Sequence, residues 1–185
     1  MSAVTDALAE RANRLHDTAL KLVARVDEDV LLRRFGPTAP PPGFHLWHMA
    51  RWADRMQALA SAVVPALGPA QQEIWVRERI ADGWGVTVPL GTFDTGMEMG
   101  DETAARLVLP GKALLLEYAT RAFAAAQRAF ALTRDEDLER MGTDLYGKEG
   151  SVASLLVGHL QHLNRHLGMI EALVGVSGTS GTASV

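Results

Sequence analysis

Three histidines lie within eight residues near the C-terminal end of the sequence, at His159, His162 and His166. In an α-helix of about 3.6 residues per turn, their spacings of three and four place all three imidazoles on one face. The same face continues on both sides with apolar residues, namely Val152, Leu155, Met169 and Leu173. This pattern is typical of a bundle helix facing its core, where an imidazole without a partner is costly. The three imidazoles therefore need partners.

Two further histidines, His45 and His48, lie in a second stretch with helical periodicity. Their spacing of three makes them neighbours on the helix surface. They share a face with Trp52 and Arg55, beside a core seam made up of Met49, Trp52, Met56, Leu59 and Val63. Five of the six histidines therefore lie on or beside the core faces of two helices. We expect the sixth, His16, at the surface or boundary of another helix.

Helical periodicity defines the elements that must position these residues. It predicts long amphipathic helices over residues 3–33, 44–65, 110–132 and 151–174, and shorter helices over 70–82, 101–106 and 135–141. Residues 83–109 are mostly irregular and contain five glycines, and we expect this connection to cover one end of the bundle. The predicted fold is all-α, a four-helix bundle with short auxiliary helices and a long loop between its second and third helices. Residues 1–175 are predicted to form one domain, and residues 176–185 a flexible tail.

Composition excludes several classes of function. The chain has 185 residues, 48% of them hydrophobic and 22% charged, which suits one globular domain with a sizeable core. Its net charge is −4 and its cations form no cluster, so we expect no nucleic-acid partner. Without a signal peptide or a long apolar run, we expect a cytoplasmic protein that does not enter a membrane. Cysteine is absent, which excludes thiolate ligands and a thiol nucleophile of the protein itself.

Several known kinds of histidine-containing site do not fit the spacing of these histidines. A structural zinc site commonly uses cysteine, and a di-iron bundle site needs Glu-x-x-His motifs, which none of the five histidines provides. No nucleophile-elbow motif supports Ser-His-Asp hydrolysis. Buried histidines that only hydrogen-bond one another remain an alternative. We favour a divalent transition metal held by two histidines of the last helix, four residues apart, and one of the second helix. Zinc and nickel are the favoured ions, with iron and manganese as alternatives, because all accept imidazole.

Two segments resemble the DinB/YfiT-like superfamily, FHLWHMARWADR at residues 44–55 and HLNRHLGMI at residues 162–170. They are similar to the family patterns W-H-(L/I/M)-A-x-x-x-D-R and H-x-x-x-H-x-G-x-I. The resemblance extends over most of residues 5–175, although only these two motifs are specific. It implies an up-down-down-up order of the four helices.

The resemblance also implies a ligand set. By motif position, the metal ligands would be His48, His162 and His166. His45 and His159 fall outside this set, as residues that line the pocket or orient a ligand. The spacing of His159 and His162 is also compatible with a metal-binding pair, so His159 stays an alternative ligand.

Characterised members of this family include bacillithiol S-transferases and a mycothiol-dependent maleylpyruvate isomerase. The resemblance therefore implies a metal that activates a low-molecular-weight thiol, such as mycothiol, bacillithiol or glutathione, for attack on a small electrophilic substrate. It also implies a homodimer, to which Trp75 and Trp84 would contribute as exposed aromatic residues. A metal-dependent hydrolase and a non-catalytic metal-binding stress-response protein are the competing hypotheses.

Other polar residues near His48 are candidates for roles in the same site. Arg51 and Arg55 could meet an anionic group of the thiol or substrate, with salt bridges at the surface or in a dimer as the alternative. Asp54 is expected to be a partner of an arginine. Tyr118 is a candidate to point from the third long helix towards the site, with a place in the core as the alternative.

Overall fold

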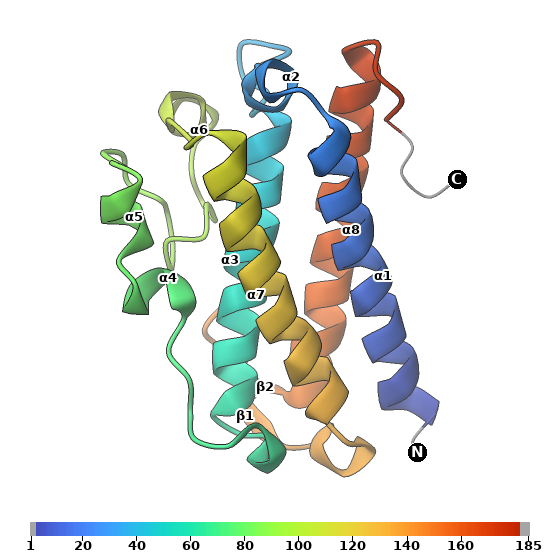
Figure 1. Ribbon diagram of the computed structural model, residues 1–185. Helices are drawn as coiled ribbons and strands as arrows, with labels where there is room; N and C mark the ends of the chain where they lie inside the picture. Colours follow the sequence, from blue (N-terminus) through green and yellow to red (C-terminus); the bar gives the residue numbers. More distant parts are fainter. Residues whose placement is uncertain (1–2, 182–185) are drawn as a thin grey trace.

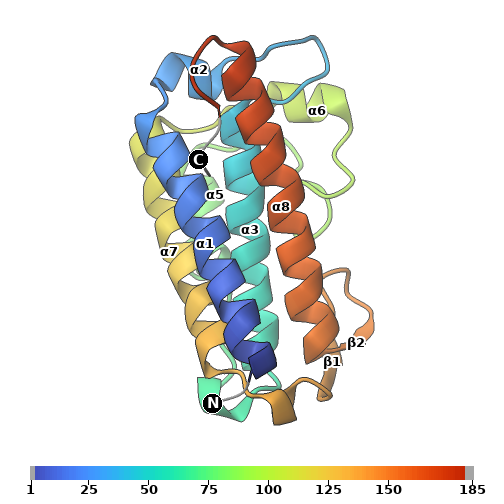
Figure 2. The same ribbon diagram turned by 90° about the vertical axis from the view of Figure 1, so that its right-hand side faces the viewer.

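The computed structural model describes residues 3–181, and four long helices make up most of it. These are α1 (Ala3–Arg25), α3 (Pro42–Ser61), α7 (Lys112–Leu132) and α8 (Val152–Val176). α1 and α8 run in one direction and α3 and α7 in the other, so the order along the chain is up, down, down, up (Figure 1). In the view turned by 90°, α8 lies beside both α1 and α3 (Figure 2). The predicted four-helix bundle is confirmed.

A turn at Asp27 divides the first predicted helix, residues 3–33, into α1 and the short α2 (Glu28–Leu32). Asp27 has an extended backbone, with φ −63° and ψ 147°. The turn brings Leu31 against the start of α3, where its carbonyl oxygen lies close to Gly43 and its side chain is fully buried. A straight helix, rising about 1.5 Å per residue, would carry Leu31 beyond the bundle end. The prediction of one continuous helix is therefore wrong.

The other long helices begin and end near their predicted positions. α3 starts at Pro42, because proline suits a first turn whose N–H groups have no helical partner. The side chain of Ser151 accepts a hydrogen bond from the N–H of Ser154 and caps α8. α7 begins at Lys112, two residues after Pro110. The last four residues of the predicted tail lie outside the described residues.

The long connection between α3 and α7 packs along the side of the bundle and does not cover one end. It contains η1 (Pro65–Leu67), α4 (Ile74–Arg77), α5 (Ile80–Gly83) and α6 (Asp101–Arg106). The helix predicted over residues 70–82 is interrupted at Arg79, whose φ of +52° is left-handed. The rings of Trp75 and Trp84 lie 5.4 and 5.7 Å from the ring of Tyr118 on α7. Trp75 is buried and Trp84 half-buried, so the prediction of an exposed Trp75 is wrong.

A short β-hairpin follows α7, and the helix predicted over residues 135–141 forms only at its start, as a 3-10 helix. The 3-10 helix η2 (Asp135–Asp137) leads into strands β1 (Met141–Thr143) and β2 (Glu149–Ser151), which pair antiparallel. Gly147 in the turn has φ +79°, a conformation that glycine adopts without steric cost. The hairpin precedes α8 directly and brings Tyr146 within 5.7 Å of the Trp52 ring of α3.

The hydrophobic core lies between the four long helices and includes Leu22, Trp47, Met49, Phe123 and Leu163, all at most 1% exposed. Several polar side chains are buried with it. Among them, His16, His159, Arg51 and Asp54 are each 0% exposed. No helix among the described residues is long and apolar enough to cross a membrane.

Candidate metal centre

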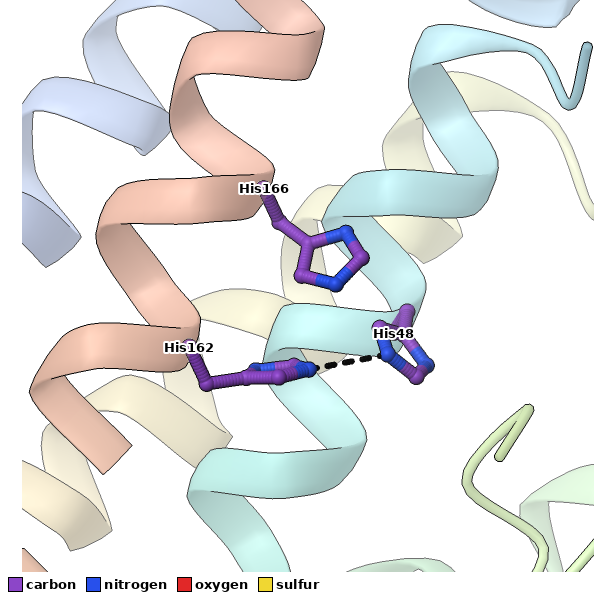
Figure 3. Close-up of side chains that lie close together, drawn as sticks. All are labelled: His48, His162 and His166. Atoms are coloured by element: carbon purple, nitrogen blue, oxygen red, sulfur yellow. Dashed lines mark hydrogen bonds between the residues drawn. The ribbon is translucent and has the colours of Figure 1, made fainter. Parts of the chain in front are cut away.

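The fold brings His48 of α3 to the same point as His162 and His166 of α8 (Figure 3). One ring nitrogen of each histidine lies within 4.8 Å of the other two. The Nε2 atoms of His48 and His162 are 2.9 Å apart. The spacing of four on α8 keeps two rings on one face, and α3 packs against that face. Three imidazole nitrogens that converge in this way could hold one divalent metal ion. We call these three residues the histidine triad.

The orientation of His48 is fixed by a backbone carbonyl. His48 Nδ1–H donates a hydrogen bond to the carbonyl oxygen of Thr95. Because a carbonyl can only accept, His48 carries its proton on Nδ1 and leaves the Nε2 lone pair directed at the other two rings. Trp52 Nε1–H donates to the same Nε2 atom over 3.1 Å, a bond that an ion bound at Nε2 would replace. Metal-binding histidines typically have a partner such as the Thr95 carbonyl on the nitrogen that does not bind the ion.

His166 is oriented by its neighbour His45. The Nδ1 atoms of the two rings lie 3.1 Å apart, and the other nitrogen of His166 points towards His48 and His162 (Figure 3). His45 therefore supports the triad without joining it. His162 differs from these two, because its Nδ1 is buried and has no partner among the described residues.

All three triad histidines are kept neutral by their surroundings. Burial lowers the pKa of His48 to about 4 and, together with the neighbouring His48 and His45, that of His166 to about 2. Burial, followed by the charges of His48 and His166, lowers the pKa of His162 still further. Neutral imidazole is the form that binds a metal ion, so at neutral pH binding requires no proton release from the triad.

A pocket of about 390 Å³ opens over the triad. Its remaining walls come from the start of α3, the loop before α6, the hairpin turn and α8, with Phe44, Trp52, Met97, Met99, Tyr146 and Met169 as its large apolar residues. This volume is enough for a small organic molecule. Two larger hollows, of about 570 and 530 Å³, lie elsewhere on the described surface and contain no histidine.

Residues 11–170 of the sequence match the DinB superfamily. The chain belongs to the DinB superfamily. Among solved structures, a conserved protein from Enterococcus faecalis is similar in fold, with a TM-score of 0.74 at 19% identity, covering 94% of this chain and 95% of that one. A DinB-like protein from Bacillus cereus has a TM-score of 0.57 at 15% identity, covering 96% of this chain and 95% of that one. No curated protein matches the sequence.

In this DinB-superfamily chain, Arg51 lies behind the triad and not in the pocket. Its five N–H groups all have partners: the carbonyls of Phe93 and Asp94, the carboxylates of Asp54 and Glu73, and the hydroxyl of Tyr118. Its guanidinium therefore has no donor left for a ligand. Since Asp94 directly precedes Thr95, Arg51 anchors the loop whose carbonyl orients His48.

Asp54 and Tyr118 belong to the same buried network. Asp54 accepts hydrogen bonds from the backbone N–H groups of Ile74 and Trp75 over 2.8 Å each, in addition to its contact with Arg51. It is an arginine partner, as predicted. Tyr118 donates its hydroxyl to Asp54 over 3.1 Å, and burial raises its pKa well above the usual value. Tyr118 is thus a core residue and does not reach the pocket.

Arg55 also lies outside the pocket and links two of the segments around it. Its Nε donates to the carbonyl of Leu145 over 3.1 Å, and its Nη1 lies 3.4 Å from the carboxylate of Glu73. Its guanidinium stacks 3.5 Å above the ring of Phe93. Arg55 therefore joins the hairpin to the long connection.

His159 is separated from the triad and forms a second histidine pair with His16 of α1. Their Nε2 atoms are 3.4 Å apart, and His16 stacks on Phe123 at 4.3 Å between ring centroids. Both imidazoles are fully buried, so the prediction of His16 at the surface or boundary is wrong. Ala12 and Ala19, one turn before and after His16, are the sequence signal for its burial.

Several residues around the pocket escaped sequence analysis. The carbonyl of Thr95 orients His48, yet any residue type could supply it. Glycine is needed at position 96, since φ is +86° there and a Cβ would lie 2.9 Å from His48 Nδ1. That glycine in the irregular segment is the signal for a close backbone approach. Tyr146 and Arg165 line the pocket only because the hairpin and α8 place them there.

Proposed function

We propose that this chain is a metal-dependent transferase that uses an external low-molecular-weight thiol. The observation that carries the proposal is the convergence of three neutral imidazoles at a pocket with room for a small molecule. The chain contains no cysteine, so the thiol must come from a second molecule. Membership of a superfamily to which thiol-dependent transferases belong supports the proposal.

His48, His162 and His166 would hold the ion, for which zinc and nickel are favoured. A bound divalent ion supplies positive charge that lowers the pKa of a thiol and stabilises its thiolate. The remaining residues orient and shield this site. Phe44 and Trp52 pack against the His48 ring, at centroid distances of 5.8 and 6.0 Å, and limit the access of water to it.

The proposal is tested by metal analysis of the purified protein followed by an assay for S-conjugates. Metal-free protein would be reloaded with zinc or nickel and given glutathione, mycothiol or bacillithiol with a small electrophile. We expect conjugate formation to require both metal and thiol and to be abolished by His166→Ala. Asn164→Ala, an exposed site on the same helix, should leave the rate unchanged. Equal rates with and without metal would refute the proposal.

Metal-assisted hydrolysis is the second candidate, because His162 is partly exposed and the pocket admits water. Ester turnover that needs metal but no thiol would favour it. Stoichiometric metal without turnover of either substrate would instead favour a binding protein. The predicted homodimer and cytoplasmic location stay predictions, and the burial of Trp75 removes one residue expected at the dimer interface.

A further inference from the structure

One cation at the pocket has no partner among the described residues. Arg165 lines the pocket from α8, directly before His166, and its side chain is exposed. Within residues 3–181 it takes part in no hydrogen bond or ion pair. The two arginines of α3 differ, since Arg51 and Arg55 both pair with Glu73. Arg165 is thus the cation beside the triad that has donors available for a ligand.

Arg165 lies close to the triad. It lines the same pocket as the three triad histidines and directly precedes His166 on α8. A molecule bound in the pocket would therefore lie in the field of this guanidinium. Because Arg165 is exposed, salt screens its interaction with any anion.

The other residues of the pocket limit the kind of anionic ligand that Arg165 could bind. The pocket walls include three methionines, which suit a soft, hydrophobic part of a ligand. Asp101 also lines the pocket and is exposed, so it opposes a ligand of high negative charge. The volume of about 390 Å³ restricts the ligand to a small molecule.

We propose that Arg165 recognises one carboxylate of the thiol, so that the cofactor or substrate of this site is a small thiol that bears a carboxylate. In this arrangement the carboxylate of the thiol pairs with the Arg165 guanidinium, and its sulfur lies at the triad. The apolar part of the thiol packs against Met97, Met99 and Met169. This inference rests on the proposed function, because it assigns the kind of thiol that the metal-loaded triad takes.

The test uses the full chain loaded with cobalt(II), whose thiolate-to-metal absorption band reports sulfur binding without any turnover. Two probes of nearly equal size are titrated, 3-mercaptopropionate and its neutral amide. We expect the acid to bind about fivefold more tightly than the amide, as befits an exposed charge-assisted contact. This preference should shrink as salt is added.

Arg165→Gln should remove the preference by weakening the acid about fivefold while leaving the amide unchanged. Arg165→Lys should retain part of it. Arg14→Gln, an exposed arginine of α1 that pairs with Glu10, is the matched control and should retain all of it. A preference that survives Arg165→Gln, or an acid that binds no better than the amide, would overturn the inference. If neither probe produces the band in cobalt-loaded protein, the proposed thiol function fails, and this inference fails with it.

Discussion

Two groups of histidines share one helix and differ in what they can do. His162 and His166 of α8 meet His48 at an open pocket, whereas His159, one turn earlier, meets only His16 in a sealed core. The residue type and the helix are the same in both places. The number of converging nitrogens and the access of solvent separate a candidate metal site from a buried pair.

The sealed pair is poorly suited to a divalent ion. It offers two ring nitrogens 3.4 Å apart, while zinc usually takes three or four protein ligands. The Nδ1 atoms of His16 and His159 are buried and have no partner among the described residues. Burial lowers the pKa of His159 to about 3, so the pair is neutral at physiological pH.

The largest expected effect is on metal affinity, and it distinguishes the histidine triad from the buried pair His16 and His159. His162→Ala removes one of three ligands and should weaken zinc or nickel binding by more than about 100-fold, since even the loss of a supporting residue costs 10–100-fold. His159→Leu should leave the affinity within about threefold. Competition with a chromophoric chelator measures both. A large loss of affinity in His159→Leu would mean that the sealed pair is part of the metal site.

Acid should destabilise the metal-free protein through both groups. A histidine whose pKa falls from 6.5 in the unfolded chain to about 4 when folded, such as His48, stays neutral in the folded state while the unfolded chain takes up a proton. Its contribution to stability is complete above pH 6.5 and is lost as the pH falls towards 4. Between pH 7 and pH 5 this amounts to about 2 kcal/mol per histidine.

Urea unfolding at several pH values tests this dependence. His159→Leu should flatten the decline between pH 7 and pH 5 by about 2 kcal/mol, because it removes one such histidine without touching the triad. An unchanged slope in this variant would contradict a neutral, buried His159.

The loop that contains Thr95 and Gly96 should affect metal affinity, because it orients His48. Gly96→Ala places a methyl group 2.9 Å from His48 Nδ1 and should weaken metal binding about tenfold by displacing the Thr95 carbonyl. Gly85→Ala is the matched control, since Gly85 also has a positive φ, +67°, but has open space around it. It should lose stability through backbone strain alone and keep its metal affinity. Equal affinities in both variants would exclude the loop from the site.

The smallest effect is expected at His45. His45→Phe removes the nitrogen that lies 3.1 Å from His166 Nδ1 and should weaken metal binding roughly fivefold. Calorimetric titration with zinc measures the change. A loss as large as that of His162→Ala would make His45 a ligand.

The long helices were predictable from local spacing, whereas the choice of His48, His162 and His166 came from the family resemblance. A spacing of four places His162 and His166 on one face, and apolar periodicity shows that this face and one face of α3 point to the core, but spacing alone left His159 as an alternative ligand. Of the buried pair His16 and His159, only His159 was predicted to lie on a core face. His159 follows from the same periodicity, but His16 was placed beside the Leu15 seam, and only its alanine neighbours one turn away, Ala12 and Ala19, indicate that it is buried.

The loop and the hairpin were not predictable for a different reason. Thr95 acts through its backbone carbonyl, so its side chain gives no signal of the role. Strands β1 and β2 form by pairing with each other, from Met141 opposite Ser151 to Thr143 opposite Glu149, and helical periodicity gives no sign of such pairing. Arg51 and Arg55 were expected to meet an anionic group of a ligand, but both lie outside the pocket and pair with Glu73, which lies in a connection whose path depends on tertiary contacts.

Several residues of the pocket walls come from other segments than the three histidines that would bind the metal. The triad lies on two long helices that also form the core, whereas Met97, Met99 and Tyr146 belong to connections outside the four long helices. Changes in those connections can reshape the space over the histidines while the bundle stays intact. One scaffold can therefore acquire different substrate preferences by small steps, and an engineered library confined to residues 97–99 and 144–147 is where such preferences should first appear.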